Sequence, residues 1–163
     1  MKLKEIESAL QQVPNFTKPI ITLEQYTTPA KLGSLVLHYM DLNGDIQGLE
    51  LADLGCGCGI FTLGCYLLGS RKVLAVDIDQ DALELCEKTL KKFISDQREK
   101  VTLINADVLT LLGDVKYESC VDVVVMNPPF GTKNNRGLDM KFLRVAAFMA
   151  RSTRCTSHPL ANT

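Results

Sequence analysis

From Glu50 onward, two kinds of hydrophobic pattern alternate along the chain. Short apolar runs that are typical of buried strands cover 50–54, 72–76, 101–104 and 121–126, and segments with helical spacing cover about 60–68, 80–95 and 138–150. Strands that are joined by helices run parallel, and a parallel sheet buries both of its faces under helices. The pattern therefore predicts a doubly wound α/β fold with a mainly parallel sheet of four strands.

Two more helices are predicted ahead of the first strand. Apolar residues at helical spacing place one over Leu3–Val13, where Pro14 ends it. The second helix has Thr28 as its N-cap and Pro29 at its first helical position, and it ends near Gly44.

Length and composition fit one domain, because the chain has 163 residues with 46% hydrophobic content. That domain covers 1–150, with N-terminal helices over 1–44 and a cofactor-binding core over 48–150. Residues 151–163 lose the periodicity and are rich in Ser, Thr and Asn, which predicts a flexible tail.

Charge and cysteine content argue against several classes of protein. The formal net charge of −1 provides no general attraction to nucleic acid or to an acidic membrane, so an RNA partner needs a local patch. Six scattered cysteines and a charged N-terminus predict reduced thiols in the nucleus and cytoplasm. Cys56 and Cys58 lack a second ligand pair, so no metal site is expected. The uncharged run 54–70 is too short for a membrane span.

A glycine-rich loop follows the first predicted strand. Gly55, Gly57 and Gly59 alternate there, after Asp53 and before a helix. Glycines let the backbone approach a ligand closely, and the next helix offers free N–H groups. The spacing G-x-G-x-G differs from the G-x-G-x-x-G of dinucleotide-binding loops. Because the Asp53 carboxylate would repel a pyrophosphate and attract an amine, the loop predicts a nucleoside with a cationic tail as the ligand.

Acidic residues also follow the next two strands. Asp77 lies about 20 residues beyond the glycines, where such folds accept hydrogen bonds from ribose hydroxyls. Asp79 fits the N-cap of the next helix. Asp107 can accept from an exocyclic amine of a base, while the Val108 backbone can contact the ring. A lone Asp is as often a turn or cap residue, but three acids at successive strand ends predict one crevice.

The second chemical motif is Asn127-Pro128-Pro129-Phe130, directly after the last predicted strand. Two prolines donate no N–H and force an open, extended corner. The Asn127 side-chain carbonyl and the Pro128 main-chain carbonyl can each accept one hydrogen of an N–H₂ group, and Phe130 can stack on a flipped base. Such bonds direct the amine lone pair toward an electrophile held in line. The alternative is a rigid turn with a buried ring.

These motifs resemble those of class I S-adenosylmethionine-dependent methyltransferases: DLGCGCG is similar to their first motif and NPPF to their amino-methylating motif. Together with LEQYTTPA, DIDQDALE and NPPFGTKNNRGLDMKFL, they are similar to the methyltransferase-like protein 5 family, which methylates N6 of an adenine in small-subunit ribosomal RNA. The resemblance covers about Leu3 to Met149. It implies a Rossmann-like fold, S-adenosylmethionine as the cofactor and 18S ribosomal RNA as the substrate.

The resemblance also implies roles for individual residues. Those that hold the cofactor are Gln25, Thr28, Gly55, Cys58, Ile60, Asp77, Asp107 and Val108, and those that receive the target adenine are Asn127, Pro128, Pro129 and Phe130. The family usually has Tyr-Pro-Thr where this chain has Tyr26-Thr27-Thr28, which loosens that turn.

A small zinc-binding activator subunit, bound through an edge strand, is a further implication of the resemblance. The uncharged, alternating strand 101–104 is the candidate edge, unless the N-terminal segment of the chain covers it. Family members continue past Ala150 with more strands and a basic segment, so a truncated or alternatively ended form is expected here. Without those strands, 121–126 would be left as an unpaired apolar edge.

Two other functions share parts of this pattern. An inactive isoform could compete for the activator subunit, and a protein glutamine N-methyltransferase would use the same Asn-Pro-Pro chemistry. The contexts EQYTT and NPPFGTKNN favour RNA. The loop 133–136 is polar and partly basic, and contact with phosphates or simple solvation fits it equally well.

Overall fold

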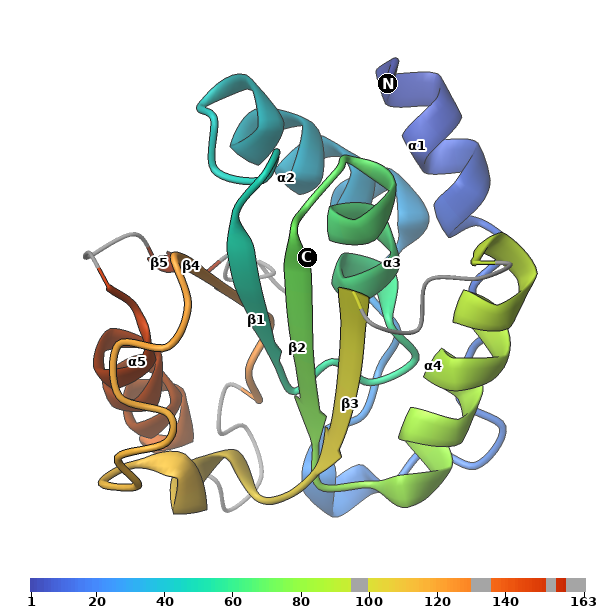
Figure 1. The fold of residues 1–163 in the computed structure, drawn as a ribbon. Coiled ribbons are helices and arrows are strands. Elements are labelled where there is room, and N and C mark those ends of the chain that lie inside the picture. Colours follow the sequence, from blue (N-terminus) through green and yellow to red (C-terminus); the bar gives the residue numbers. More distant parts are fainter. Residues whose placement is uncertain (95–99, 130–135, 152–154, 158–163) are drawn as a thin grey trace.

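A five-stranded sheet, entirely parallel, forms the centre of the computed structural model, which describes residues 1–94, 100–129, 136–151 and 155–157 (Figure 1). The strands are β1 (Glu50–Leu54), β2 (Lys72–Asp77), β3 (Val101–Asn105), β4 (Val123–Met126) and β5 (Cys155–Ser157). Their spatial order is β3-β2-β1-β4-β5, and every neighbouring pair is parallel. The predicted α/β class with a parallel sheet is therefore confirmed, as is the edge position of β3.

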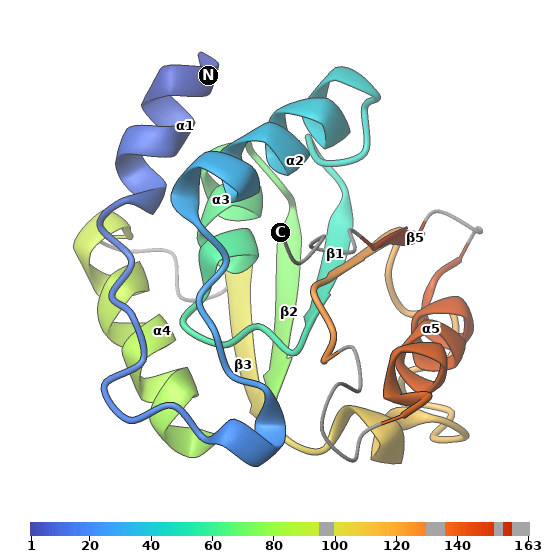
Figure 2. The same cartoon turned by 180° about the vertical axis from the view of Figure 1, so that it is seen from behind.

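Helices cover both faces of this sheet. They are α1 (Leu3–Leu10), α2 (Ala30–Leu42), α3 (Ile60–Leu67), α4 (Gln80–Phe93) and α5 (Leu138–Met149), with short 3₁₀ helices η1 (Ile21–Leu23) and η3 (Val108–Leu111). Seen from behind, α1 to α4 lie on one side of the sheet (Figure 2). Helix α5 packs with η3 on the opposite side.

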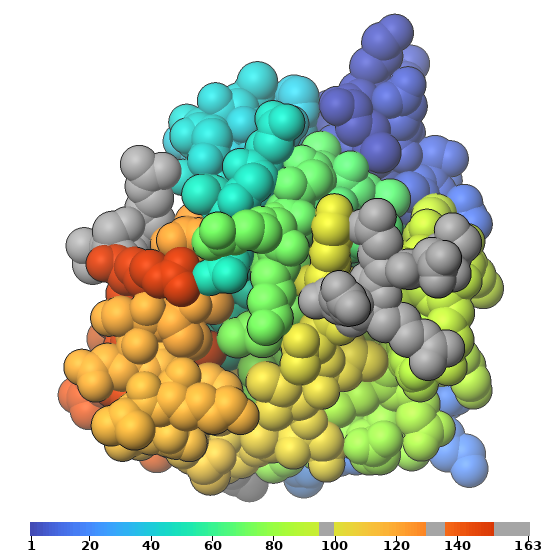
Figure 3. Space-filling model, viewed as in Figure 1, coloured from blue at the N-terminus to red at the C-terminus, as the bar shows by residue number. Residues whose placement is uncertain are grey.

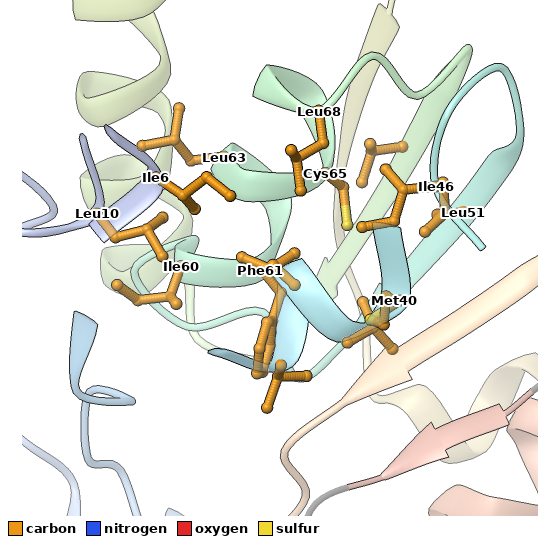
Figure 4. Packing of buried hydrophobic residues seen from close by; sticks show 14 of the residues in the cluster. Ile6, Leu10, Met40, Ile46, Leu51, Ile60, Phe61, Leu63, Cys65 and Leu68 are labelled. Atoms are coloured by element: carbon orange, nitrogen blue, oxygen red, sulfur yellow. The ribbon is translucent and has the colours of Figure 1, made fainter. Parts of the chain in front are cut away.

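Alternation along the strands divides the buried residues into two main cores. Leu51 and Val73 point to the side of α1 to α4, where they join Ile6, Met40 and other apolar residues (Figure 4). Their neighbours Ala52 and Val76, together with Val124 and Met126, face α5. A strand that is buried on both faces must be apolar at nearly every position, which explains the continuous apolar runs in the sequence.

Close contact between α2 and α3 depends on glycine. A Cβ on Gly64 of α3 would overlap the Leu37 side chain of α2, and a Cβ on Gly33 of α2 would lie 2.7 Å from Ile60 Cγ2. Both partner side chains are buried, so they have little room to move away. The glycines thus set how closely these helices pack over the sheet.

The fifth strand corrects the prediction of a four-stranded sheet. Residues 155–157 lie within the segment that was predicted to be a flexible tail, yet they pair with β4 through Val124 and Cys155, Val125 and Thr156, and Met126 and Ser157. The predicted unpaired edge on β4 is therefore wrong as well. Three residues are too few to show a period-2 pattern, which is why the sequence gives no sign of this strand.

Arg151 connects the end of α5 to the sheet just before β5. Its guanidinium contacts Asp122 Oδ1 at 2.8 Å and Glu50 Oε2 at 2.7 Å, and it donates to the Cys120 carbonyl. Its main-chain N–H donates to the Val121 carbonyl at 2.8 Å. With the Arg151 bond to Asp122 adding to a main-chain N–H donated by Glu50, the pKa of Asp122 lies below its usual value. These contacts direct the chain alongside β4.

Several element boundaries differ from the predicted ones by a few residues. The first helix ends at Leu10 rather than Val13, and the last strand before the Asn-Pro-Pro motif begins at Val123 rather than Val121. Val121 makes only an isolated bridge to Ala150. Helix ends fray and strand ends depend on pairing, so hydrophobic spacing alone does not fix them.

The two faces of the sheet are not equally covered. In the space-filling view, parts of β2 and β3 reach the surface in green and yellow beside the orange 110–127 region (Figure 3). A groove of about 380 Å³ lies there, lined by residues that include Leu74, Thr102, Ile104 and Tyr117.

Within the described residues, no helix is both long and apolar enough to cross a membrane.

Candidate active site

A cavity of about 240 Å³ lies at the carboxyl ends of the strands. The predicted site residues that line it are Gln25, Thr28, Gly55, Gly57, Cys58, Ile60, Asp77, Asp107, Val108, Asn127 and Pro129. Asp53, Gly59 and Pro128 are not among its lining residues, and Phe130 lies outside the described residues. The sequence thus identified residues from five separate segments that the fold brings to one cavity.

The first two loop glycines shape the cavity wall. Gly55 and Gly57 have positive φ angles of 73° and 52°, which favour glycine. A Cβ on Gly57 would lie 3.1 Å from Phe16 Cζ, so the N-terminal segment packs directly on this loop. The Gly57 N–H donates to Asp77 Oδ2 at 2.7 Å, which joins the loop to the end of β2.

Gly59 has a different function from the other two loop glycines. Its φ of 92° makes it the left-handed N-cap of α3, and a Cβ there would overlap Cys86 Sγ of α4. The third glycine therefore permits close packing of the loop against α4, and its predicted contact with the cofactor stays a prediction.

Asp77 organises the centre of the site. Besides the Gly57 bond, its Oδ1 accepts from the Asp79 N–H at 2.9 Å. Burial raises the pKa of Asp77 above its usual value, although both backbone bonds oppose this. Each carboxylate oxygen has a second acceptor position, so the residue can still accept from ribose hydroxyls as predicted.

Gln25 ties the N-terminal segment to the far side of the cavity. Its Nε2 donates to Asp79 Oδ2 at 2.6 Å, and its Oε1 accepts from the Ile20 N–H at 2.8 Å. Asp79 Oδ1 accepts from the Asp81 N–H at 3.0 Å, which confirms the predicted N-cap of α4. The segment over the cavity is thereby held by one side chain that bonds in two directions.

The third acidic residue, Asp107, is turned into the cavity by a short helix. Its Oδ1 accepts from the Leu109 N–H at 2.9 Å and caps η3, and Val108 next to it is buried. Asn105 at the end of β3 donates to the carbonyls of Asp77 and Ile78, which holds the ends of β2 and β3 together. Asp77 and Asp107 therefore both face the one cavity.

Asp53 lies behind the cavity wall. Its side chain is 1% exposed, and Oδ2 accepts from the Thr62 hydroxyl at 2.6 Å. Oδ1 is buried and has no hydrogen-bond partner among the described residues. Burial raises the pKa of this carboxyl to about 7, against the lowering effect of the Thr62 bonds. Its predicted contact with a cationic tail stays a prediction, and the structure places Asp53 outside the residues that line the cavity.

Asn127 and Thr28 meet at the opposite side of the cavity. Asn127 Nδ2 donates to Thr28 Oγ1 at 3.0 Å, and Asn127 Oδ1 is buried without a partner among the described residues. Thr28 is not the predicted N-cap of the second helix, because that position belongs to Pro29 and no side-chain cap bond forms. Its hydroxyl is directed to Asn127 instead. An unpaired buried acceptor beside a cavity suits a ligand that brings N–H groups.

Hydrophobic spacing did not identify several apolar residues of the cavity. Phe16, Tyr26, Leu138 and Phe142 line it. Phe16 and Tyr26 come from the irregular, proline-containing segment between α1 and α2, where periodicity carries no information. The sequence feature that could have identified Phe16 and Tyr26 as cavity residues is the presence of aromatic side chains in an irregular segment.

The donor set fits S-adenosylmethionine and gives no sign of a metal site. Buried acceptors at Asp53 and Asn127, with acids at Asp77 and Asp107, suit a cationic nucleoside and an amine beside it. Burial raises the pKa of Cys58 to about 11, so this thiol lines the cavity as a neutral group. No cluster of three metal-binding side chains occurs in the described part of the chain.

Comparison with known proteins gives concordant results. The sequence model of the methyltransferase small domain family matches residues 32–153. The chain is 41% identical to the rRNA N(6)-adenosine-methyltransferase METTL5 of Danio rerio, over 97% of this chain and 74% of that protein. It is 39% identical to the METTL5 rRNA N(6)-adenosine-methyltransferase of Drosophila melanogaster, over 97% and 73%. A candidate RNA methyltransferase from Pyrococcus horikoshii has a similar crystal structure, with a TM-score of 0.79 and 34% identity over 91% of this chain and 69% of that one.

The packing role of Gly59 can be tested against a glycine with the same backbone geometry. Gly113 has a φ of 87° and no atom within 4 Å of its Cβ position. We expect Gly113→Ala to lower the free energy of unfolding by about 1 kcal/mol through backbone strain alone. Gly59→Ala should cost about 2–4 kcal/mol, since overpacking against Cys86 adds to that strain. Chemical denaturation measures both, and equal losses would contradict the packing role.

The buried Asp53 carboxyl should make stability depend on pH. Because its pKa rises from 3.8 to about 7 on folding, the folded state binds the proton more tightly than the unfolded state does. The Asp53 contribution to stability therefore falls as pH rises from about 4 to about 7 and is constant above that. Asp53→Asn should flatten this part of the curve of unfolding free energy against pH. If chemical denaturation between pH 5 and pH 8 gives Asp53→Asn the same slope of unfolding free energy against pH as the wild type, Asp53 is ionised in the folded state.

Proposed function

The chain belongs to the METTL5 family of rRNA N6-adenosine methyltransferases, and from this premise we propose how its cavity performs S-adenosylmethionine-dependent methylation of an rRNA adenosine. The observation that carries the proposal is Asn127 Oδ1, a buried acceptor at the cavity without a partner among the described residues. An exocyclic amine that enters the cavity supplies the missing donor.

The Asn-Pro-Pro corner orients the target amine. Asn127 Oδ1 accepts one hydrogen of the N6 amine, and the Pro128 main-chain carbonyl accepts the other. Both bonds draw electron density toward nitrogen and hold its lone pair in the direction of the cavity. When bound, S-adenosylmethionine would supply an electrophilic methyl group on a sulfonium sulfur, and transfer of that methyl to N6 would break the S–C bond and leave a neutral thioether. The methylated amine is strongly acidic until it loses a proton, which water can accept, so the site needs no strong general base.

The remaining lining residues hold the cofactor. Asp77 accepts from ribose hydroxyls, and Asp107 accepts from the adenine amine while the Val108 backbone contacts the ring. Gly55, Cys58 and Ile60 line the cavity on one side. Gln25 closes over it through its bond to Asp79, and Asp53 balances the positive tail from behind the wall.

The RNA substrate is 18S ribosomal RNA in this proposal, with the adenine stacked on Phe130. The relatives support rRNA as the substrate class, and the preference for 18S rests on the sequence motifs. A net charge of −1 offers no general attraction to RNA, so docking needs a local basic surface or a second subunit. The thiols of Cys56, Cys58, Cys65, Cys86 and Cys120 are free, which favours the reducing nucleus and cytoplasm.

We also propose that a small zinc-binding activator subunit adds a strand to β3. This strand is the terminal strand of the sheet, and its outer side has no strand partner in the described residues. Thr102 is exposed beside the groove that Leu74 and Ile104 help to line, so a partner strand could bury apolar surface as it pairs. Main-chain bonding to an open edge is a common mode of recognition.

Removing the amide of Asn127 should separate chemistry from cofactor binding. We expect Asn127→Ala to reduce methyl transfer to rRNA by at least about 100-fold, because the amine loses its alignment. Cofactor affinity should change by less than about threefold, a difference below about 0.7 kcal/mol. Radiolabel transfer measures the first quantity and calorimetry the second. Asp77→Ala is the matched control, in which cofactor binding itself is lost.

Two outcomes would contradict this mechanism. Equal loss of binding and transfer in Asn127→Ala would make Asn127 a structural residue. Transfer by the wild-type chain to a glutamine-containing peptide, without transfer to RNA, would support the protein glutamine alternative.

Hydrogen exchange tests the activator proposal. When this chain is co-expressed with the subunit, amides of 101–105 should exchange at least about tenfold more slowly than in the free chain, because pairing protects them from solvent. Amides of α2, on the face of the sheet that α1 to α4 cover, serve as the reference and should keep their rates. Protection at β5 without protection at β3 would place the subunit at the other edge of the sheet.

A further inference from the structure

We propose that Thr28 is a positioning residue, which holds the Asn127 amide so that Oδ1 faces the target amine. This inference rests on the proposed function of Asn127 and extends it to a second residue. Its basis is the 3.0 Å bond from Asn127 Nδ2 to Thr28 Oγ1, between residues 99 positions apart in the chain.

Packing fixes the Thr28 side chain. The residue is 8% exposed, and its Cγ2 methyl lies 3.9 Å from the Cβ position of Gly33, one turn into α2. A β-branched side chain has few rotamers, so burial of the methyl on the side of Gly33 also limits the directions that the hydroxyl can take. Pro29, the N-cap residue of α2, has a φ of −57° that its ring fixes, which restrains the backbone on the other side of Thr28.

This anchor decides which end of the amide faces the cavity. An amide has a donor end and an acceptor end, and the two differ little in shape. In the structure Nδ2 is used by Thr28, and Oδ1 is left buried without a partner among the described residues. A rotated amide would present N–H₂ to the N–H₂ of adenine, which is a repulsive arrangement. Holding Nδ2 at Thr28 therefore prepares the acceptor before the substrate arrives.

The same segment of chain also covers the cofactor side of the cavity. Gln25, three residues before Thr28, bonds to Asp79 at the start of α4. A single stretch from Gln25 to Thr28 thus contacts the helix that follows β2 and the corner that follows β4. The segment that closes over the cofactor through Gln25 is therefore the same one that orients the Asn127 amide through Thr28.

Variants of Thr28 distinguish a positioning role from a purely structural one. Thr28→Val keeps the shape and removes the hydroxyl, and Thr28→Ser keeps the hydroxyl and removes the methyl. We expect Thr28→Val to lower kcat for rRNA about 10-fold to 100-fold, which corresponds to about 1.4–2.7 kcal/mol. The loss of kcat should exceed any rise in the KM for S-adenosylmethionine, and Thr28→Ser, which keeps the hydroxyl, should restore most of the kcat that Thr28→Val loses. Thr28→Ala replaces Thr28→Val if the latter does not fold.

Combining Thr28→Val with Asn127→Ala tests whether Thr28 acts through Asn127. If it does, Thr28→Val causes no further loss of kcat in the Asn127→Ala background. Independent, multiplicative losses would overturn the inference, as would a wild-type kcat in Thr28→Val or equal losses in the Val and Ser variants. A rise in KM for S-adenosylmethionine with unchanged kcat would make Thr28 a cofactor contact only.

Failure of the proposed function would be visible separately. If the wild-type chain forms no N6-methyladenosine in rRNA, as detected by mass spectrometry, the proposed function fails while the anchor can still be tested. The melting temperatures of the two single variants and the double variant then decide it. Non-additive shifts support the bond between Thr28 and Asn127, and additive shifts overturn it.

Discussion

The parallel alignment of β1, β2 and β4 is the constraint on which the site depends. Leu54 at the end of β1 is in register with Val76 on one side and Met126 on the other. The three strands therefore end at the same side of the sheet, and the chain changes direction after each of them. The glycine loop, Asp77 and the Asn-Pro-Pro corner meet at this edge because no strand runs back between them.

Direct hydrogen bonds then make these turns into one site. Gly57 and Asp79 both donate main-chain N–H groups to Asp77, so the carboxylate holds two loops at fixed positions. Gln25 extends the connection to the N-terminal segment through Asp79. Because every one of these groups is at least partly buried, each bond is protected from competition with water. Hydrogen bonds between the segments around the cavity therefore hold it in shape.

The buried polar side chains at the carboxyl ends of the strands differ in how many of their atoms have hydrogen-bond partners. Asp77 receives two backbone bonds, whereas Asp53 has one oxygen paired with Thr62 and the other unpaired among the described residues. Asn127 shows the same asymmetry, with its nitrogen bonded and its oxygen free. Unpaired buried acceptors cost free energy in the unliganded chain. Asp53 Oδ1 and Asn127 Oδ1 lie near the places where a cationic cofactor and an amine are to bind, which gives their cost a functional reason, whereas Ser70 Oγ and His38 Nδ1 are unpaired among the described residues and lie outside the cavity.

The sequence by itself determined the fold class, the glycine loop, the acids at the strand ends and the Asn-Pro-Pro corner, because these depend on local spacing and backbone geometry. Only the tertiary structure decided that Gly59 packs on Cys86, that Asp53 lies behind the wall and that Thr28 bonds to Asn127. It also decided that residues 155–157 pair with β4. Each of these facts joins segments far apart in the chain, and no local pattern records such a contact.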